Sequence, residues 1–385
     1  MVGNVVEKVL ITGLGAVSRL GLSVADLWDG LCDAKAGPTP VADDFGVIRE
    51  AYQVPRGHDP MPGGRATAYA STAATAALAD AGLADADLSA AGVLVGTTLG
   101  DIDELERAYA AGAAPGPSPY GVTAALATWL GTHGPTRSIS TGCSAGLYAV
   151  GLAAELIRSG EADLMVAGGA ETLSRVAYGS LDRLGLLDPV HCRPFDTDRQ
   201  GMVPGEGAAM LVLESASHAA RRGARQPYAE VGGFGWSCDG YHATAQEPSG
   251  RHLGRAMRDA LGAAGVAADR IGAVLPHRAG VAANDTIETD AIAAVLGRAG
   301  VAVHGSKAVL GHTAGAAGAF ACLVGALILT HRLVPPNAHV DQLDPQCPLD
   351  VVVDRPAPLS ASNVLVSGTG FGGNNGALVL GGAAC

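Results

Sequence analysis

A thiol, two imidazoles and an amine are the groups in this 385-residue chain whose types and spacing could do chemistry. Cys143 stands in a Ser-Thr-Gly-Cys-Ser-Ala-Gly run at 140–146, and His277 and His312 follow, with Lys307 five residues before His312. A thiol beside two imidazoles can hold an acyl group as a thioester and can stabilise a carbanion next to a second thioester. The set therefore indicates carbon–carbon bond formation on acyl chains.

Cys143 falls where a predicted strand, 136–140, runs into a predicted helix, 144–158. The first N–H groups of a helix are unpaired and its dipole favours an anion, so we expect the Cys143 thiolate to be stabilised. The remaining cysteines lack such a position, and a free cysteine is ordinarily a small buried apolar residue. We expect this for Cys32, Cys192, Cys238, Cys322, Cys347 and Cys385.

The two histidines differ in what surrounds them. His277 follows a predicted buried strand, 271–275, where a loop should emerge toward a cleft, although a lone histidine there is more often a structural hydrogen-bonding residue. Six small residues, 314–319, come after His312, and they would let a helix approach another backbone closely and place His312 near Cys143. Lys307 could fix a histidine tautomer or stay charged beside the thiolate.

Strands and helices alternate along the chain in two successive rounds, which predicts a layered α/β fold with parallel-rich sheets. The first round has strands at 9–12, 92–96, 136–140, 162–168 and 206–214 and helices at 65–81, 101–111 and 144–158. The second has strands ending at 231 and at 271–275, 351–353 and 364–366, with helices at 251–264, 286–296 and 314–329. No Ser/Gly-rich linker separates the rounds, so we expect two halves of one unit, 1–228 and 229–385.

Composition and charge exclude several classes of protein. The formal charge of −12 argues against a nucleic-acid or anionic-membrane partner, while leaving room for a local basic patch that binds an acidic carrier protein. Seven scattered cysteines without a C-x-x-C pair favour reduced cytosolic thiols over a disulfide framework or a zinc site, which predicts a cytoplasmic protein without a metal. No signal peptide is visible, and the apolar run 314–329 is too short for a membrane span.

These motifs in this order resemble those of the β-ketoacyl synthases, the condensing-enzyme branch of the thiolase-like fold, over nearly the whole chain. They are the Thr-Gly-Cys-Ser at 141–144, the first-histidine segment ending in Asn-Asp at 284–285, the segment 307–313 and the Gly-Phe-Gly-Gly at 370–373. The resemblance implies two pseudo-repeated, layered αβαβα halves and a type II fatty acid or polyketide synthase. It also implies an acyl carrier protein partner, no cofactor besides the carrier's phosphopantetheine, and a homodimer or a heterodimer with a second ketosynthase-like subunit.

The resemblance also implies a role for each residue that matches a family motif. Cys143 would take the acyl chain from the carrier's pantetheine. His277 and His312 would hydrogen-bond the malonyl thioester and stabilise the enolate formed as carbon dioxide leaves. Lys307 and Glu288 would hold the histidines and an ordered water in place.

The glycine loop and the first-histidine loop differ in how well they fit the family. The N–H groups of Cys143 and Phe371 would make an oxyanion hole, worth roughly 3 kcal/mol per donor in related acyl-transfer sites, and the Phe371 ring would gate the acyl channel. The family usually reads His-Gly-Thr-x-Thr at the first histidine, its threonine hydroxyls binding the pantetheine amide, whereas this chain has His-Arg-Ala-Gly-Val at 277–281. Arg278 either reaches a carboxylate or phosphate or points into solvent. The segment 96–143 is also shorter than usual.

Several functions are compatible with these residues. The first hypothesis is a bacterial condensing enzyme of polyketide-type or fatty-acid-type biosynthesis. The second is an acyltransferase that passes the acyl group to an amine or alcohol without decarboxylation, which Arg278 and the missing threonines favour. The third is a chain-length-factor-like partner subunit, against which Cys143 argues, because such subunits typically lack the nucleophile. A cysteine hydrolase is a distant fourth, because we identify no acidic residue to pair with a histidine.

Overall fold

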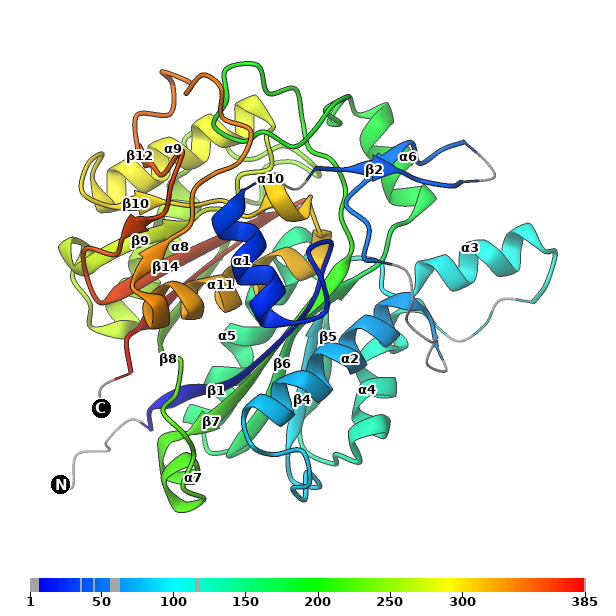
Figure 1. Ribbon diagram of the computed structural model, residues 1–385, viewed down its shortest axis with the longest axis vertical. Helices are drawn as coiled ribbons and strands as arrows, with labels where there is room; N and C mark the ends of the chain where they lie inside the picture. Colours follow the sequence, from blue (N-terminus) through cyan, green and yellow to red (C-terminus); the bar gives the residue numbers. More distant parts are fainter. Residues whose placement is uncertain are drawn as a thin grey trace.

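A sheet of 11 strands runs through the protein, in the order β12-β10-β9-β14-β15-β8-β1-β7-β6-β4-β5 (Figure 1). The structure is a computed structural model that describes residues 7–34, 37–43, 46–55, 63–114, 116 and 118–383. In chain order the strands of this sheet are β1 (Val9–Val17), β4 (Gly92–Gly96), β5 (Thr136–Ile139), β6 (Leu164–Glu171), β7 (Gly207–Ser215), β8 (Ala229–Cys238), β9 (Ile271–Leu275), β10 (Ala302–Val303), β12 (Asp350–Val351), β14 (Asn363–Gly370) and β15 (Asn374–Gly381).

The two halves of the chain repeat one topology and meet where β1 pairs antiparallel with β8. Outward from this seam, the N-terminal half runs β1-β7-β6-β4-β5 and the C-terminal half runs β8-β15-β14-β9-β10, with β12 added at the end. In both halves the first two pairings are antiparallel and the next two are parallel. The predicted pair of pseudo-repeated halves is confirmed, while the boundary between residues 228 and 229 stays a prediction.

The sheet is mixed, so the prediction of parallel-rich sheets was wrong for its middle. Parallel neighbours occupy both ends, but β14, β15, β8, β1, β7 and β6 pair antiparallel. One reason is β15, which the sequence pattern did not reveal. It returns beside β14 after the short turn 371–373, where Gly372 and Gly373 take φ angles of 85° and 77°. Antiparallel strands can be joined by so short a turn, whereas parallel strands need a crossover.

Two apolar helices, α5 (Ala145–Arg158) and α11 (Ala317–His331), pack against each other between the two halves of the sheet (Figure 1). At Gly146 and Gly318 their contact leaves no room for a side chain. A Cβ on Gly146 would lie 2.8 Å from the carbonyl oxygen of Gly315 and 2.9 Å from the backbone nitrogen of Ala319. A Cβ on Gly318 would lie 2.6 Å from that of Leu147. The small residues after His312 therefore allow the close approach that the sequence predicted.

Further helices cover the outer faces of the sheet and complete five layers, α-β-α-β-α. In the N-terminal half these are α2 (Arg65–Asp80) and α4 (Val122–Leu130), and in the C-terminal half α8 (Arg251–Ala264) and α9 (Ala282–Leu296). Strand residues alternate between the central core around α5 and α11 and one of the two outer cores. Burying one Leu or Val side chain stabilises the folded state by about 1.5–3 kcal/mol, so the apolar face of each layer holds it against the next layer.

The remaining described elements are short and lie mostly in connections. They are α1 (Val24–Asp33), α3 (Ile102–Ala110), α6 (Arg175–Arg183), α7 (Ala216–Arg221), α10 (Lys307–Leu310), the 3-10 turns η1 (Pro119–Gly121), η2 (Gly142–Ser144), η3 (Ala268–Arg270) and η4 (Ala314–Ala316), and the strand pairs β2 (Thr39–Pro40) with β3 (Glu50–Ala51) and β11 (Leu333–Val334) with β13 (Ala357–Pro358).

Element boundaries agree best where a clear apolar pattern ends at a glycine or proline. The predicted bounds of β4, β9 and α8 are those observed, and α2 ends one residue before its prediction. In contrast, α9 begins at Ala282 instead of residue 286, so that the Asn-Asp pair at 284–285 lies in its first turn. The sequence analysis missed α6, which has a single buried residue, Tyr178, and therefore no apolar stripe to detect.

The helix α11 is part of the core. Together with η4 it forms an apolar run from Ala314 to His331, and these 18 residues are long and apolar enough to cross a membrane. However, 78% of this run is buried inside the protein. The prediction of a buried helix is therefore confirmed by its packing. The prediction that the run is too short for a membrane span was wrong.

The close contact of α5 and α11 can be tested with two helical glycines. We expect Gly318→Ala to lower the free energy of unfolding by about 1–3 kcal/mol, because the new methyl group meets Leu147. Gly262→Ala is the matched control, since nothing lies within 4 Å of its Cβ position on α8, and alanine there should be neutral or stabilising by about 0.5–1 kcal/mol. Thermal denaturation of both variants measures the difference, and equal melting temperatures would contradict this account.

Candidate active site

Cys143 lies at the sharp turn between β5 and α5. Gly142 precedes it with a φ of 64°, and the 3-10 turn η2 leads directly into α5. The end of β14 packs on this turn, because a Cβ on Gly370 would lie 2.5 Å from the carbonyl oxygen of Thr141 and 3.1 Å from the backbone nitrogen of Cys143. The structure thus brings the segments that carry Cys143 and Phe371 together, as the predicted oxyanion hole requires.

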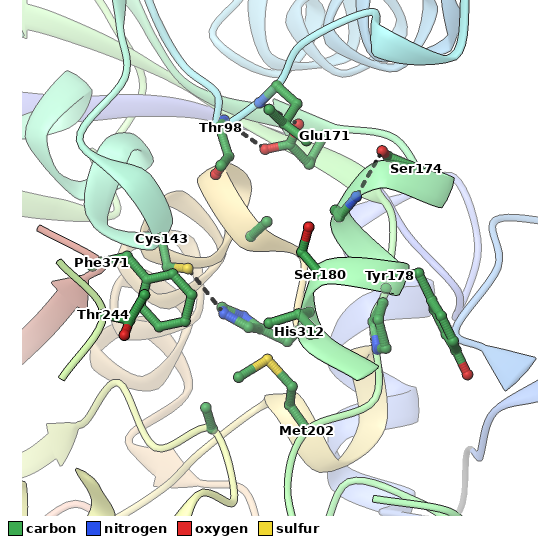
Figure 2. A pocket seen from close by; sticks show the side chains of 18 of the residues that line it. Thr98, Cys143, Glu171, Ser174, Tyr178, Ser180, Met202, Thr244, His312 and Phe371 are labelled. Atoms are coloured by element: carbon green, nitrogen blue, oxygen red, sulfur yellow. Dashed lines mark hydrogen bonds between the residues drawn. The ribbon is translucent and has the colours of Figure 1, made fainter. Parts of the chain in front are cut away.

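The structure also places His312 against the thiol. Its Nε2 lies 3.2 Å from the Cys143 Sγ (Figure 2). The backbone of His312 is held on both sides, since its N–H donates to the carbonyl of Val203 at 2.8 Å and its carbonyl accepts from the N–H of Gly205 at 3.0 Å. Its buried Nδ1 has no hydrogen-bond partner among the described residues. The ring is therefore fixed in place while either nitrogen can carry the proton.

His277 completes the predicted set of imidazoles. Its ring meets that of His312 edge to face, with centroids 5.3 Å apart and planes at 84°. Its backbone is held at both ends: the N–H donates to Glu288 Oε1 at 2.7 Å, and the carbonyl accepts from Lys307 Nζ. The two rings and the thiol therefore share one site, although they come from opposite halves of the chain.

Lys307 and Glu288 act on the His277 backbone rather than on an imidazole nitrogen. Glu288 accepts from the N–H groups of His277 and Arg278 at 2.7 and 2.9 Å and from the Ser367 hydroxyl at 2.9 Å. Lys307 is buried, which lowers its pKa, and the charge of Glu288 opposes this shift. Of the two roles left open for Lys307, the structure favours a charge beside Cys143 and does not show contact with a ring nitrogen.

Burial determines the charges of the catalytic groups. Desolvation raises the pKa of the Cys143 thiol to about 11, although nearby Lys307 lowers it, and lowers the pKa of His312 to about 3. The pKa of His277 also lies well below its usual value, because of burial and then because of Lys307 and His312. The resting pair is thus a neutral thiol and a neutral imidazole. The direction of this shift is opposite to that expected for a stabilised thiolate, because loss of water outweighs the favourable field of Lys307.

A cavity of about 280 Å³ opens in front of this pair. Apolar side chains from and around α6 form one wall, among them Leu173, Val176 and Leu181. In Figure 2, Phe371 lies beside Cys143, while Met202, Tyr178 and Ser180 surround the space beyond His312. A cavity of this kind can hold an apolar chain attached to the thiol, with the imidazoles at its inner end.

Glu171 is a residue of this site that the sequence analysis missed. It ends β6 and is buried, which raises its pKa even though backbone N–H groups oppose the shift. Its carboxylate accepts from the N–H groups of Thr98 at 2.6 Å, Leu99 at 3.1 Å and Gly315 at 3.0 Å. It thereby ties the loop after β4 to the start of η4, just behind His312. The sequence does offer one signal for this residue, since Glu171 is a charged residue at the end of an otherwise apolar strand.

Arg278 does not point into solvent, and the carboxylate near it is that of Asp285 inside the protein. Arg278 is fully buried with a φ of 27°, and its guanidinium lies 4.7 Å over the Phe195 ring. One Nη contacts Cys347 Sγ at 3.0 Å and lies 3.9 Å from Asp285, and the other donates to the Thr289 hydroxyl. The arginine therefore supports the loop from below and does not reach toward a substrate or solvent. The reason is Asp285, whose buried carboxylate holds it.

The five-layered fold and the thiol–imidazole pair define a thiolase-like protein with a cysteine nucleophile. Among the described residues, no group of three His, Cys, Asp or Glu side chains is placed to hold a metal ion. The chain belongs to the β-ketoacyl synthase family: the model "Beta-ketoacyl synthase, N-terminal domain" matches residues 64–219, and "Beta-ketoacyl synthase, C-terminal domain" matches 228–341.

Relatives with this fold support the assignment over the whole chain. The chain is 33% identical over 407 residues to 3-oxoacyl-[acyl-carrier-protein] synthase 2 of Coxiella burnetii, covering 97% of this chain and 98% of that protein. It is similar to the structure of the ishigamide ketosynthase/chain length factor, with 37% identity, a TM-score of 0.90 and coverage of 98% and 100% of the two chains. A type II polyketide synthase acyl-carrier protein in complex with its ketosynthase bound to the hexaketide matches at 29% identity and TM-score 0.89, with the same coverage.

The charge state of Cys143 predicts how its reactivity depends on pH. Because its pKa is raised to about 11, the thiolate fraction grows tenfold per pH unit at neutral pH. The rate of alkylation of Cys143 by iodoacetamide should therefore still rise at pH 9. Lys307→Met should move the profile to higher pH, and Glu171→Gln to lower pH. Peptide mapping in a Cys238→Ser background separates this reaction from the exposed thiol. A rate that levels off near pH 7 would instead support a stabilised thiolate.

Proposed function

We propose that this protein is a 3-oxoacyl-[acyl-carrier-protein] synthase, which joins a cysteine-bound acyl group to a malonyl-type carrier substrate in bacterial polyketide or fatty-acid-type biosynthesis. The observation that carries this proposal is the 3.2 Å contact of Cys143 Sγ with His312 Nε2, with the His277 ring packed on His312 at the same cavity. Acyl loading needs the thiol and one imidazole, and decarboxylation needs both imidazoles as hydrogen-bond donors.

In the loading step, the Cys143 sulfur attacks the thioester carbonyl of the acylated carrier. His312 Nε2 takes the thiol proton and returns it to the leaving pantetheine sulfur, so the enzyme ends as a cysteine thioester with no net change of charge. His312 is neutral and so has a lone pair for this proton, but its lowered pKa makes it a weak base, so the proton must move as the sulfur attacks. In this proposal, the negative oxygen that forms transiently accepts hydrogen bonds from the N–H groups of Cys143 and Phe371, whose segments lie together.

In the condensing step, both imidazoles act as hydrogen-bond donors, so His312 changes from accepting a proton to donating a hydrogen bond. Once Cys143 is acylated it has no proton to offer, and His312 can carry its proton on Nε2, since Nδ1 has no fixed partner. His277 and His312 then donate to the malonyl thioester oxygen as carbon dioxide leaves. The enolate carbon attacks the acyl carbon, the carbon–sulfur bond to Cys143 breaks, and the thiolate takes up one proton from solvent through His312.

The enzyme of this proposal works with carrier-bound substrates and without a resident cofactor. The 3-oxoacyl-[acyl-carrier-protein] synthase and the carrier–ketosynthase complex described above support an acyl carrier protein as its partner. The proposed location is cytoplasmic, and the burial of α11 inside the core argues against a membrane-spanning role for the most apolar helix of the described chain. The chain-length-factor-like alternative is less favoured, because Cys143 is present and paired with His312.

A second candidate function keeps the loading step and transfers the acyl group to an amine or alcohol. The observation in its favour is the first-histidine loop, where Ala279 lines the cavity with a methyl group in place of a hydroxyl. Such an acceptor needs a base to remove its proton and needs no decarboxylation. His312 could supply the base, whereas His277 would have no evident task.

Mass spectrometry of the carrier protein after incubation with acyl- and malonyl-loaded forms distinguishes these functions. Condensation lengthens the acyl chain on the carrier, acyl transfer to a small amine leaves a bare carrier, and an inert partner subunit changes nothing. We expect condensation. Cys143→Ala should abolish it with the fold intact, whereas Cys238→Ala, a change of an exposed cysteine, should retain it.

The two histidines should separate loading from condensation. We expect His277→Ala to load Cys143 at a nearly normal rate and to condense about 100-fold more slowly, because its hydrogen bond forms only to the second substrate. Rapid-quench detection of acylated Cys143 measures the first step, and carrier mass the second. Condensation at a near wild-type rate by this variant would count against the proposed mechanism.

We also propose that the protein dimerises through the β5 edge, either with itself or with a second ketosynthase-like subunit. β5 ends the sheet, its residues 136–138 are exposed, and on the adjoining α4 the Trp129 side chain is 57% exposed. Such an edge offers unpaired backbone groups to a second strand. Trp129→Glu should shift the mass measured by light scattering toward the monomer, and Trp236→Glu, an exposed tryptophan on β8, should not. Equal dimerisation of both variants would exclude this surface.

A further inference from the structure

The wall of the cavity opposite α6 carries polar groups that the mechanism above does not use. It is formed by residues 244–246, before α8, and by 369–371, at the end of β14. His277 and Ala279 of the first-histidine loop line the same cavity. A thioester arm that reaches Cys143 through this cavity therefore meets Ala279, which has no hydrogen-bonding side chain, and this polar wall.

Gln246 is the residue of that wall with an unmet hydrogen bond. Its Nε2 donates to the Thr369 hydroxyl at 2.8 Å, which fixes the orientation of the carboxamide. Its Oε1 is buried and has no partner in the part of the chain that the structure describes. A buried carbonyl oxygen without a donor is unfavourable, so a ligand with an N–H group would gain by filling the position.

The pair offers one acceptor and one donor side by side. Gln246 Oε1 can accept a hydrogen bond, and the Thr369 hydroxyl, whose oxygen already accepts from Gln246, still has its own proton to donate. A secondary amide presents the complementary pair, an N–H and a C=O. The pantetheine arm contains secondary amides between its sulfur and its phosphate end, and the cavity is where its thioester must lie.

We propose that Gln246 and Thr369 form the subsite for a secondary amide of the pantetheine arm, in place of the two threonine hydroxyls that this chain lacks at 279 and 281. The subsite rests on the proposed function, because that function brings pantetheine thioesters into this cavity. It makes Gln246 a specificity-determining residue: it favours thioesters that carry an amide and does not take part in bond making.

The experiment compares two malonyl thioesters, malonyl-pantetheine and the malonyl thioester of a simple alkyl thiol with no amide. We expect Gln246→Leu to lower kcat/KM for malonyl-pantetheine about five- to tenfold, as for loss of a hydrogen bond, and to leave the alkyl thioester unchanged. Thr369→Val should act in the same way, and Thr369→Ser, which keeps the hydroxyl, should restore the preference.

Two controls separate this role from a structural one. Gln342→Leu makes the same chemical change at an exposed glutamine that is not among the cavity-lining residues, and it should alter neither thioester. The proposal is overturned if Gln246→Leu reduces the use of both thioesters equally, or if it reduces neither.

Binding of pantetheine itself distinguishes failure of the subsite from failure of the proposed function. Calorimetric titration should show that wild-type protein binds pantetheine at least fivefold more tightly than Gln246→Leu, with no turnover required. If the wild type fails to condense but shows this difference, the proposed function is wrong and the amide subsite stands. If it condenses and the two proteins bind pantetheine equally, the subsite is wrong and the function stands.

Discussion

The contact of α5 with α11 is the constraint on which the site depends. Cys143 lies just before α5 and His312 just before α11, so the distance between thiol and imidazole is set by how closely the two helices approach. Gly146 and Gly318 allow that approach because neither presents a side chain to the other helix. The pseudo-repeat of the sheet makes the arrangement possible, since each half contributes one central helix, and each helix brings one reacting group to the same place.

Burial at this junction makes the Cys143 thiol less nucleophilic at rest but also protects it from side reactions. It keeps Cys143 as a thiol and His312 as a neutral imidazole, so in the proposed mechanism the proton moves as the sulfur attacks the acyl group. A permanent thiolate would be more open to alkylation and oxidation between turnovers. The charge of Lys307 lowers the pKa of Cys143, and the charge of Glu171 raises it. They do so from positions held by backbone hydrogen bonds, to the His277 carbonyl and from the Gly315 N–H.

Local patterns in the sequence carried most of the fold and the identity of the reacting groups. Strands such as β4 and helices such as α8 show their periodicity within a dozen residues, and Cys143, His277 and His312 stand in recognisable motifs. What the sequence did not reveal depends on contacts between distant segments. The antiparallel β15 needs a partner found only in three dimensions, and the charge of Cys143 depends on its burial and on Lys307 and Glu171, which are distant in the sequence. Arg278 looked like a ligand-binding residue because its burial depends on Phe195 and Cys347, which are distant in the sequence, as well as on Asp285.

The buried Arg278 has a consequence for the evolutionary history of the first-histidine loop. Exchanging it for the glycine usual in the family would relieve its positive φ, but would leave a space over Phe195 and would deprive Thr289 and Cys347 of a partner. Of the two arginines near it, Asp285 would retain Arg199, at 3.2 Å. A single substitution in either direction therefore passes through a poorly packed intermediate. The arginine packs with its neighbours as one unit, so chains that share Arg278 are expected to share Thr289 and Cys347, whose side chains it contacts, as well.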